Sequence, residues 1–164
     1  MIEKGMIKKM CMLGDAGVGK TSLVKRYVYN IFSDEYIETI GTNISKKVIE
    51  LKKNVVATLL IWDITGHLAH TQLHSSYFEG SDGAFIVGDI TRKETIDNMD
   101  LWLKRFYDVV GENPVVFIIN KCDLIPPNEK ISKKFEGKLH IFTSAKTGEN
   151  VEDAFRTLCE KMVI

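Results

Sequence analysis

The sequence lacks an excess of charge of either sign, since 22 lysines and arginines are matched by 22 aspartates and glutamates. Proteins that bind nucleic acid through its phosphates carry a basic excess, so we expect no nucleic-acid partner. No apolar run approaches the roughly 20 residues that span a bilayer. The N-terminus also has no long apolar stretch of the kind found in signal peptides. We therefore expect a cytoplasmic protein.

Cysteine is also scarce, with three residues in a chain of 164. Cys11, Cys122 and Cys159 are widely separated and show no pairing pattern, which argues against a fold built on disulfides. Cys11 lies in an apolar segment and Cys159 on the apolar side of the last amphipathic segment, so we expect both to fill the core. The chain has no linker or low-complexity stretch. Its length predicts a single domain over residues 1–164.

Short apolar runs, typical of buried strands, alternate with amphipathic segments of helical spacing. The expected strands cover residues 6–13, 85–87, 114–119 and 139–142, and the expected helices cover residues 22–29, 96–110 and 151–162. Residues 48–51 and 55–62 flank a short polar turn, which predicts a hairpin. This alternation predicts an α/β fold with a mostly parallel sheet, helices on both faces and one antiparallel pair of strands.

The most informative segment is Gly14-Asp15-Ala16-Gly17-Val18-Gly19-Lys20-Thr21, which fits GxxxxGK[ST] at every fixed position. It stands between an expected strand and an expected helix. In this setting glycines let the backbone wrap around an anion, and the first amides of the helix point at it. Lys20 would reach the β- and γ-phosphates, and the Thr21 hydroxyl would bind magnesium. The residues expected to bind a nucleotide here are Asp15, Ala16, Gly17, Val18, Gly19, Lys20, Thr21 and Ser22.

A second motif, Asn120-Lys121-Cys122-Asp123, follows a continuous apolar run and identifies the base. The Asp123 carboxylate can accept hydrogen bonds from N1–H and the 2-amino group of guanine. Adenine has no donors at these places and would leave the carboxylate desolvated and unpaired. We expect Asn120 to brace the surrounding loops and the Lys121 stem to cover one face of the purine. Ser144, Ala145 and Lys146 follow the next apolar run and would present a backbone amide to the guanine oxygen.

In these motifs and their order, the chain resembles a small GTPase of the Ras superfamily, of the Ras and Rab-like branch, from Lys8 to about Met162. The resemblance implies the G-domain fold of the P-loop NTPases, with a six-stranded, mostly parallel sheet. It also implies a molecular switch that binds GTP or GDP with magnesium and hydrolyses GTP.

The resemblance also assigns roles to four further residues. Phe32 matches the aromatic residue that lies against guanine. Thr39 matches the threonine of the first switch segment, which binds magnesium and senses the γ-phosphate. Asp63 and Gly66 match the DxxG motif, in which the aspartate holds magnesium through water and the glycine amide binds the γ-phosphate. The expected metal ligands are thus Thr21, Thr39 and Asp63.

His67 stands where most members of this family carry a glutamine that orients the attacking water. A neutral imidazole offers one donor and one acceptor, so we expect His67 to position the water. Lys20, Thr39 and Gly66 are the other expected catalytic residues. We expect slow turnover, at or below the order of 10⁻⁴ to 10⁻³ per second that small GTPases show without an activator. The alternative is a GTP-binding scaffold with little or no hydrolysis that acts as an interaction module.

His67, His70 and His74 are spaced by three and four residues, which places them on one face if the segment is helical. This spacing is compatible with a zinc site, and also with a pH-sensitive surface for partners.

The end of the chain offers no lipidation motif, since Cys159 lies too early for a prenylation signal and Ile2 follows Met1. We expect either a protein without a lipid anchor or a sequence from which a tail is missing. The resemblance further implies protein effectors and regulators that bind the two switch segments. Nothing in the sequence requires more than a monomer.

Overall fold

The structure, a computed structural model, describes residues 5–37, 39, 42–64, 66 and 71–164. A six-stranded sheet with the strand order β2-β3-β1-β4-β5-β6 forms its centre. The strands are β1 (Met6–Gly14), β2 (Thr42–Glu50), β3 (Val56–Ile64), β4 (Gly83–Asp89), β5 (Val115–Asn120) and β6 (His140–Phe142). Neighbouring strands are parallel, except that β2 and β3 form an antiparallel pair. The predicted fold class is confirmed.

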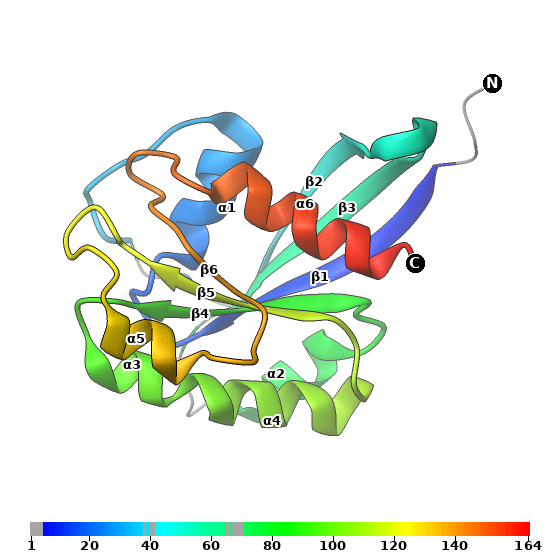
Figure 1. Cartoon of the computed structure of the whole chain (residues 1–164). Coiled ribbons are helices and arrows are strands. Elements are labelled where there is room, and N and C mark those ends of the chain that lie inside the picture. Colours follow the sequence, from blue (N-terminus) through cyan, green and yellow to red (C-terminus); the bar gives the residue numbers. More distant parts are fainter. Residues whose placement is uncertain (1–4, 38, 40–41, 65, 67–70) are drawn as a thin grey trace.

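Helices cover both faces of this sheet (Figure 1). On one face lie α1 (Lys20–Tyr29) and α6 (Val151–Met162). The other face carries α2 (Thr71–Phe78), α3 (Lys93–Asp97), α4 (Met99–Val110) and α5 (Glu129–Lys134). None of the helices in the described part of the chain is long and apolar enough to cross a lipid bilayer.

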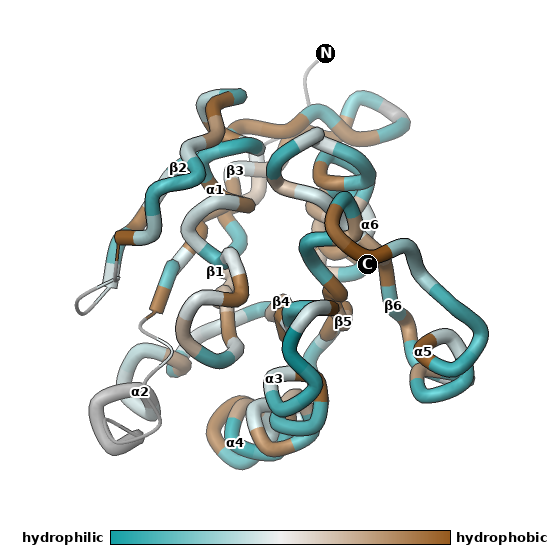
Figure 2. The backbone as a smooth tube through the Cα atoms, turned by 90° about the vertical axis from the view of Figure 1, so that its left-hand side faces the viewer, coloured by the Kyte–Doolittle hydropathy of each residue, from teal (hydrophilic) through white to brown (hydrophobic). Residues whose placement is uncertain are grey.

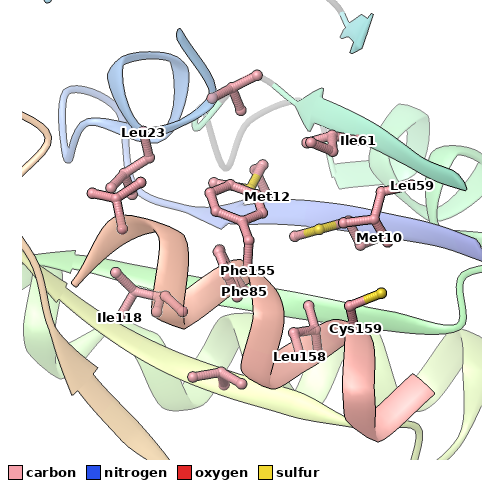
Figure 3. Packing of buried hydrophobic residues seen from close by; sticks show 14 of the residues in the cluster. Met10, Met12, Leu23, Leu59, Ile61, Phe85, Ile118, Phe155, Leu158 and Cys159 are labelled. Atoms are coloured by element: carbon pink, nitrogen blue, oxygen red, sulfur yellow. The ribbon is translucent and has the colours of Figure 1, made fainter. Parts of the chain in front are cut away.

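Each face of the sheet has its own buried apolar cluster. Under α1 and α6, the Phe155 ring stacks on Tyr27 with ring centroids 4.1 Å apart, and it meets Phe85 of β4 at 4.7 Å. Figure 3 shows Phe155 and Phe85 at the centre of this cluster, with Cys159 further along α6. Cys159 and Cys11 are fully buried, on opposite faces, which confirms their predicted role in the core. Burial of a large apolar side chain such as Phe155 contributes about 1.5–3 kcal/mol to the stability of the fold.

Strand β2 begins at Thr42, six residues before the predicted start of the hairpin. It is an edge strand, and Ile49 is its only buried residue among those that the structure describes. Edge strands with few buried positions give a weak apolar signal, which explains the short prediction. Figure 2 accordingly shows β2 as a mixture of hydrophilic and hydrophobic residues.

The predicted helix over residues 96–110 is in fact two helices, α3 and α4, that meet at Asn98. The apolar spacing continues across the junction, so periodicity alone could not reveal the break. The side-chain amide of Asn98 donates a hydrogen bond to the Asp15 carboxylate at 2.7 Å. The junction therefore contacts the GxxxxGK[ST] segment, residues 14–21.

Helix α5 was not predicted, because it has no buried residue and hence no apolar stripe. Its start is capped by Asn128, whose side-chain oxygen accepts a hydrogen bond from the Ile131 amide at 3.0 Å. The capping asparagine was the available sequence signal for this helix.

Candidate functional site

The loops that follow the parallel strands meet at one edge of the sheet and line a cavity. Most of the residues predicted to bind the nucleotide line this cavity. They are Ala16, Gly17, Gly19, Lys20, Thr21, Ser22, Phe32, Thr39, Gly66, Asn120, Lys121, Asp123, Ala145 and Lys146. Of the predicted set, Asp15, Val18 and Ser144 do not line it and instead support its walls.

Asp15 supports the phosphate loop, residues 14–21, from the side of α4. Its carboxylate accepts hydrogen bonds from Asn98 Nδ2 at 2.7 Å and from Trp102 Nε1 at 2.9 Å. Both carboxylate oxygens therefore have neutral donors. The Asp15 side chain anchors the loop rather than facing the cavity.

Gly19 shows why the phosphate loop requires glycine. Its backbone has a φ of 102°, in the left-handed region that favours glycine. A Cβ atom at this position would lie 2.3 Å from Nδ2 of Asn120. The loop can therefore approach Asn120 this closely only because Gly19 has no side chain.

Lys20 is the first residue of α1 and is almost completely buried, with 6% of its surface exposed. Its ammonium group donates hydrogen bonds to the carbonyl oxygens of Gly14 at 2.7 Å and Asp15 at 3.0 Å. Burial lowers the pKa of Lys20 to about 8, although the negative charges of Asp63 and Asp15 act in the opposite direction. A desolvated cation at a helix start suits a bound anion.

Three oxygen-bearing side chains converge beside Lys20. The hydroxyl oxygen of Thr21 lies 2.6 Å from that of Thr39 and 2.5 Å from Oδ2 of Asp63. Asp63 is 3% exposed, and its Oδ1 has no hydrogen-bond partner among the described residues. Burial raises the pKa of Asp63, whereas the Thr21 hydroxyl and the Lys20 charge lower it. Two hydroxyls and a carboxylate with an unpartnered buried oxygen fit a hard cation such as magnesium.

At the other end of the cavity, Asn120 connects two loops. Its Nδ2 donates to the Val18 carbonyl at 3.0 Å. Its Oδ1 accepts hydrogen bonds from the Thr143 hydroxyl at 3.0 Å and the Ala145 amide at 3.3 Å. Asn120 thus ties the phosphate loop to the segment after β6.

Asp123 is held by the serine of the third motif, because the Ser144 hydroxyl donates to its Oδ1 at 2.8 Å. Ser144 itself is fully buried. Arg26 of α1 fixes the same segment by donating from Nε to the Ala145 carbonyl at 2.8 Å. The carboxylate therefore has a fixed orientation at the cavity wall.

Sequence reasoning missed a second group of lining residues. They are Lys25, Ile31, Ser33, Asp34, Glu35, Tyr36, Ile37 and Leu124. Most of them belong to a segment that has no motif of its own. Its position between Phe32 and Thr39 was the only indication in the sequence that it borders the site.

Gly66 lines the cavity and packs closely on the phosphate loop, since a Cβ atom there would lie 2.4 Å from the Ala16 nitrogen. His67 and His70 lie outside the described residues, and for His74 only the backbone, in α2, is described. The water-positioning role of His67 and the zinc hypothesis therefore stay predictions.

Known proteins resemble this chain along nearly its whole length. A family model described as "Ras family" matches residues 9–164. The Ras-related protein Rab-32 of Homo sapiens is 33% identical over 168 residues, which cover 95% of this chain and 75% of that protein. The GTP-binding protein ypt1 of Schizosaccharomyces pombe is 34% identical over 168 residues, with coverages of 98% and 82%. The Ras-related protein RGP2 of Oryza sativa subsp. japonica is 32% identical over 163 residues, with coverages of 95% and 75%. Because the family model matches nearly the whole chain and these relatives are each at least 32% identical to it, the chain belongs to the Ras family of small GTPases.

Proposed function

We propose that this chain binds GTP and GDP with magnesium in the cavity and acts as a switch that hydrolyses GTP slowly. The observation that carries the proposal is the convergence of Thr21, Thr39 and Asp63 beside the buried Lys20. Oxygen ligands for a cation and a desolvated ammonium group are what a nucleotide polyphosphate requires.

Guanine is selected at Asp123. The Ser144 hydroxyl fixes one oxygen of this carboxylate, so the group is oriented before the base arrives. It then accepts the N1–H and 2-amino donors of guanine. A base without these donors leaves a charged acceptor unpaired, which costs about 1–3 kcal/mol or more.

Hydrolysis proceeds by attack of water on the γ-phosphorus, with cleavage of its bond to the oxygen that bridges the β- and γ-phosphates. The products are GDP and inorganic phosphate. Magnesium held by Thr21, by Thr39 and, through water, by Asp63 would neutralise charge on the phosphate oxygens. Lys20 stabilises the same charge from the phosphate loop, and His67 accepts a hydrogen bond from the attacking water.

Loss of the γ-phosphate gives the switch its two states. Thr39 and Gly66 then lose their contacts with that group, and the segments that carry them relax. Protein partners that bind the first switch segment would distinguish the two states. Its exposed side chains Tyr36 and Ile37 are 65% and 67% accessible and offer apolar contact area.

Single-turnover hydrolysis of GTP by the magnesium-loaded protein, measured between pH 5.5 and 8.5, tests this proposal. We expect a slow rate that falls as imidazole becomes protonated and collapses in His67→Ala. A negligible rate in both proteins, with GTP still bound, would favour the alternative function of a GTP-binding scaffold. Absence of guanine-nucleotide binding would refute both.

A further inference from the structure

Asp89, the last residue of β4, is a buried carboxylate that does not line the nucleotide cavity. Its side chain is only 1% exposed, yet each of its oxygens has two donors. Oδ1 accepts the Thr91 amide at 2.8 Å and the Thr91 hydroxyl at 2.6 Å. Oδ2 meets Lys121 Nζ at 2.8 Å and Arg92 Nε at 3.1 Å. Burial raises the pKa of Asp89, but the hydrogen bonds from Lys121, Thr91 and Arg92 outweigh it, so the pKa is lowered and the group is ionised.

Both cations that pair with Asp89 also bind the phosphate loop. Arg92 donates from its second guanidinium nitrogen to the carbonyl oxygen of Ala16 at 2.9 Å. Lys121 donates to the carbonyl oxygen of Gly17 at 2.8 Å. One buried carboxylate thereby holds, through two side chains, two successive carbonyls of the loop.

The direction of these carbonyls fixes the direction of two amides. In a planar trans peptide, the carbonyl of one residue and the N–H of the next point in opposite directions. With the Ala16 and Gly17 carbonyls turned outward to Arg92 and Lys121, the amides of Gly17 and Val18 point away from those side chains. Amides held in this way form the concave donor set that binds an anion.

The guanidinium group of Arg92 also covers the outer side of Gly17. A Cβ atom on Gly17 would lie 3.2 Å from the Arg92 nitrogen and 3.7 Å from the Tyr36 ring. The outer rim of the loop is therefore packed by residues of the same chain. Packing and hydrogen bonding act together to hold the loop in one shape.

We propose that Asp89, acting through Arg92 and Lys121, is a positioning residue that holds the Gly17 and Val18 amides in their phosphate-binding direction and so sets how long the nucleotide is retained. The inference rests on the proposed binding of GDP and GTP in the cavity. It adds residues outside the cavity lining that govern the strength of that binding.

The test is the dissociation rate of fluorescent GDP from the magnesium-loaded protein and its variants. Asp89→Asn should release GDP about tenfold faster, because a neutral amide cannot make the charge-assisted hydrogen bonds that hold Arg92 and Lys121. Arg92→Ala should accelerate release by roughly three- to tenfold. Arg92→Lys should be intermediate, since one ammonium group cannot reproduce both arms of the guanidinium. Because Asp89 acts partly through Arg92, the double variant should release GDP more slowly than the product of the two single effects predicts.

Asp97→Asn is the matched control. Asp97 also pairs with a lysine, Lys134, but it is 47% exposed and this pair does not touch the phosphate loop. We expect the wild-type dissociation rate in this variant. Arg92 is 39% exposed, so Arg92→Ala should fold even if loss of the buried Asp89 charge proves too disruptive.

Competition by GDP and by GMP separates positioning from general destabilisation. If the network orients amides for the terminal phosphate, Arg92→Ala should lower the ratio of GDP affinity to GMP affinity. Wild-type release rates in both single variants, or faster release with an unchanged ratio, would overturn the inference while leaving nucleotide binding intact. A wild-type protein that does not bind GDP would instead refute the proposed function, and this inference with it.

Discussion

The hydroxyl oxygens of Thr21 and Thr39 lie 2.6 Å apart, although 18 positions of sequence separate the two residues. Thr21 is in the first turn of α1, whereas Thr39 lies in the segment between α1 and β2. The contact brings the first switch segment to the phosphate loop. Because the Thr21 hydroxyl also contacts Asp63, the three side chains lie next to one another at the proposed magnesium site.

Thr39→Ala should weaken magnesium binding by the GTP complex, because the cation loses a protein oxygen ligand. We expect about a tenfold higher magnesium concentration for half-maximal retention of GTP, from the loss of one charge-assisted contact. The measurement is release of a fluorescent GTP analogue during a magnesium titration. Thr39→Ser keeps the hydroxyl and should behave as wild type. If GTP release depended on magnesium in the same way in Thr39→Ala and wild type, Thr39 would not be a magnesium ligand.

Asp123→Asn should shift base preference from guanine toward xanthine. The amide replaces one acceptor of the carboxylate by a donor, which suits a base with a carbonyl at position 2. Competition by GDP and xanthosine diphosphate measures the shift, which we expect to exceed about tenfold in the affinity ratio. Ser144→Ala is the control, since it removes the donor to Asp123 but keeps the carboxylate. Guanine selectivity that survives Asp123→Asn would refute the base assignment.

Gly66→Ala should disturb the close contact between Gly66 and the phosphate loop. A Cβ atom at this position would lie 2.4 Å from the Ala16 nitrogen and 2.7 Å from the Gly14 oxygen, so backbone must move. We expect the affinity for GDP to change little. The difference in conformation between the GDP and GTP complexes should be lost. Protease protection of the GDP and GTP complexes provides the comparison. A normal difference between the two complexes would contradict this expectation.

Tyr27 provides a pH test of the core that does not involve the nucleotide. Burial, with further contributions from Cys159 and Glu152, raises the pKa of Tyr27 to about 12, from an ordinary value of 10.0. A raised pKa in the folded state gives stability that is complete below pH 10 and is lost as the pH rises towards 12. Because Tyr27 is only partly buried, solvent screening reduces this effect, and at pH 11 the wild type should have lost at most about 1 kcal/mol of unfolding free energy through this group.

Tyr27→Phe keeps the ring that stacks on Phe155 but cannot ionise. Its loss of stability between pH 8 and 11, measured by urea unfolding, should be smaller than that of wild type by this amount. Tyr29→Phe, a change at a 64% exposed tyrosine, is the control and should follow the wild type. Parallel pH profiles for wild type and Tyr27→Phe would show that the Tyr27 hydroxyl stays solvated.

The sequence predicted those parts of the fold that carry a periodic apolar signal. Strands β1 and β5 and helix α6 fall close to their predicted positions, because each has a buried face. Helix α5 has no buried residue, so its residues carry no such signal. The Ras and Rab-like resemblance is confirmed by the family match over residues 9–164.

The cavity lining was also largely predictable, because its motifs are contiguous in sequence. The network around Asp89 was not predictable. It joins the ends of β4 and β5 to backbone carbonyl oxygens, and no sequence pattern marks such a contact because every residue has a carbonyl oxygen. Arg92 looks like an ordinary surface cation in the sequence. Only its distances to Asp89 and Ala16 identify its contact with the loop.

The junction of α3 and α4 at Asn98 affects the freedom of the phosphate loop. Asn98 and Trp102 hold Asp15 from one side, while Arg92 and Lys121 hold the next two carbonyls from another. Residues of the protein itself therefore hold the loop on both sides. A nucleotide that meets a preorganised loop loses little binding free energy to ordering it. The rate of nucleotide release should accordingly depend on how firmly these contacts hold the loop.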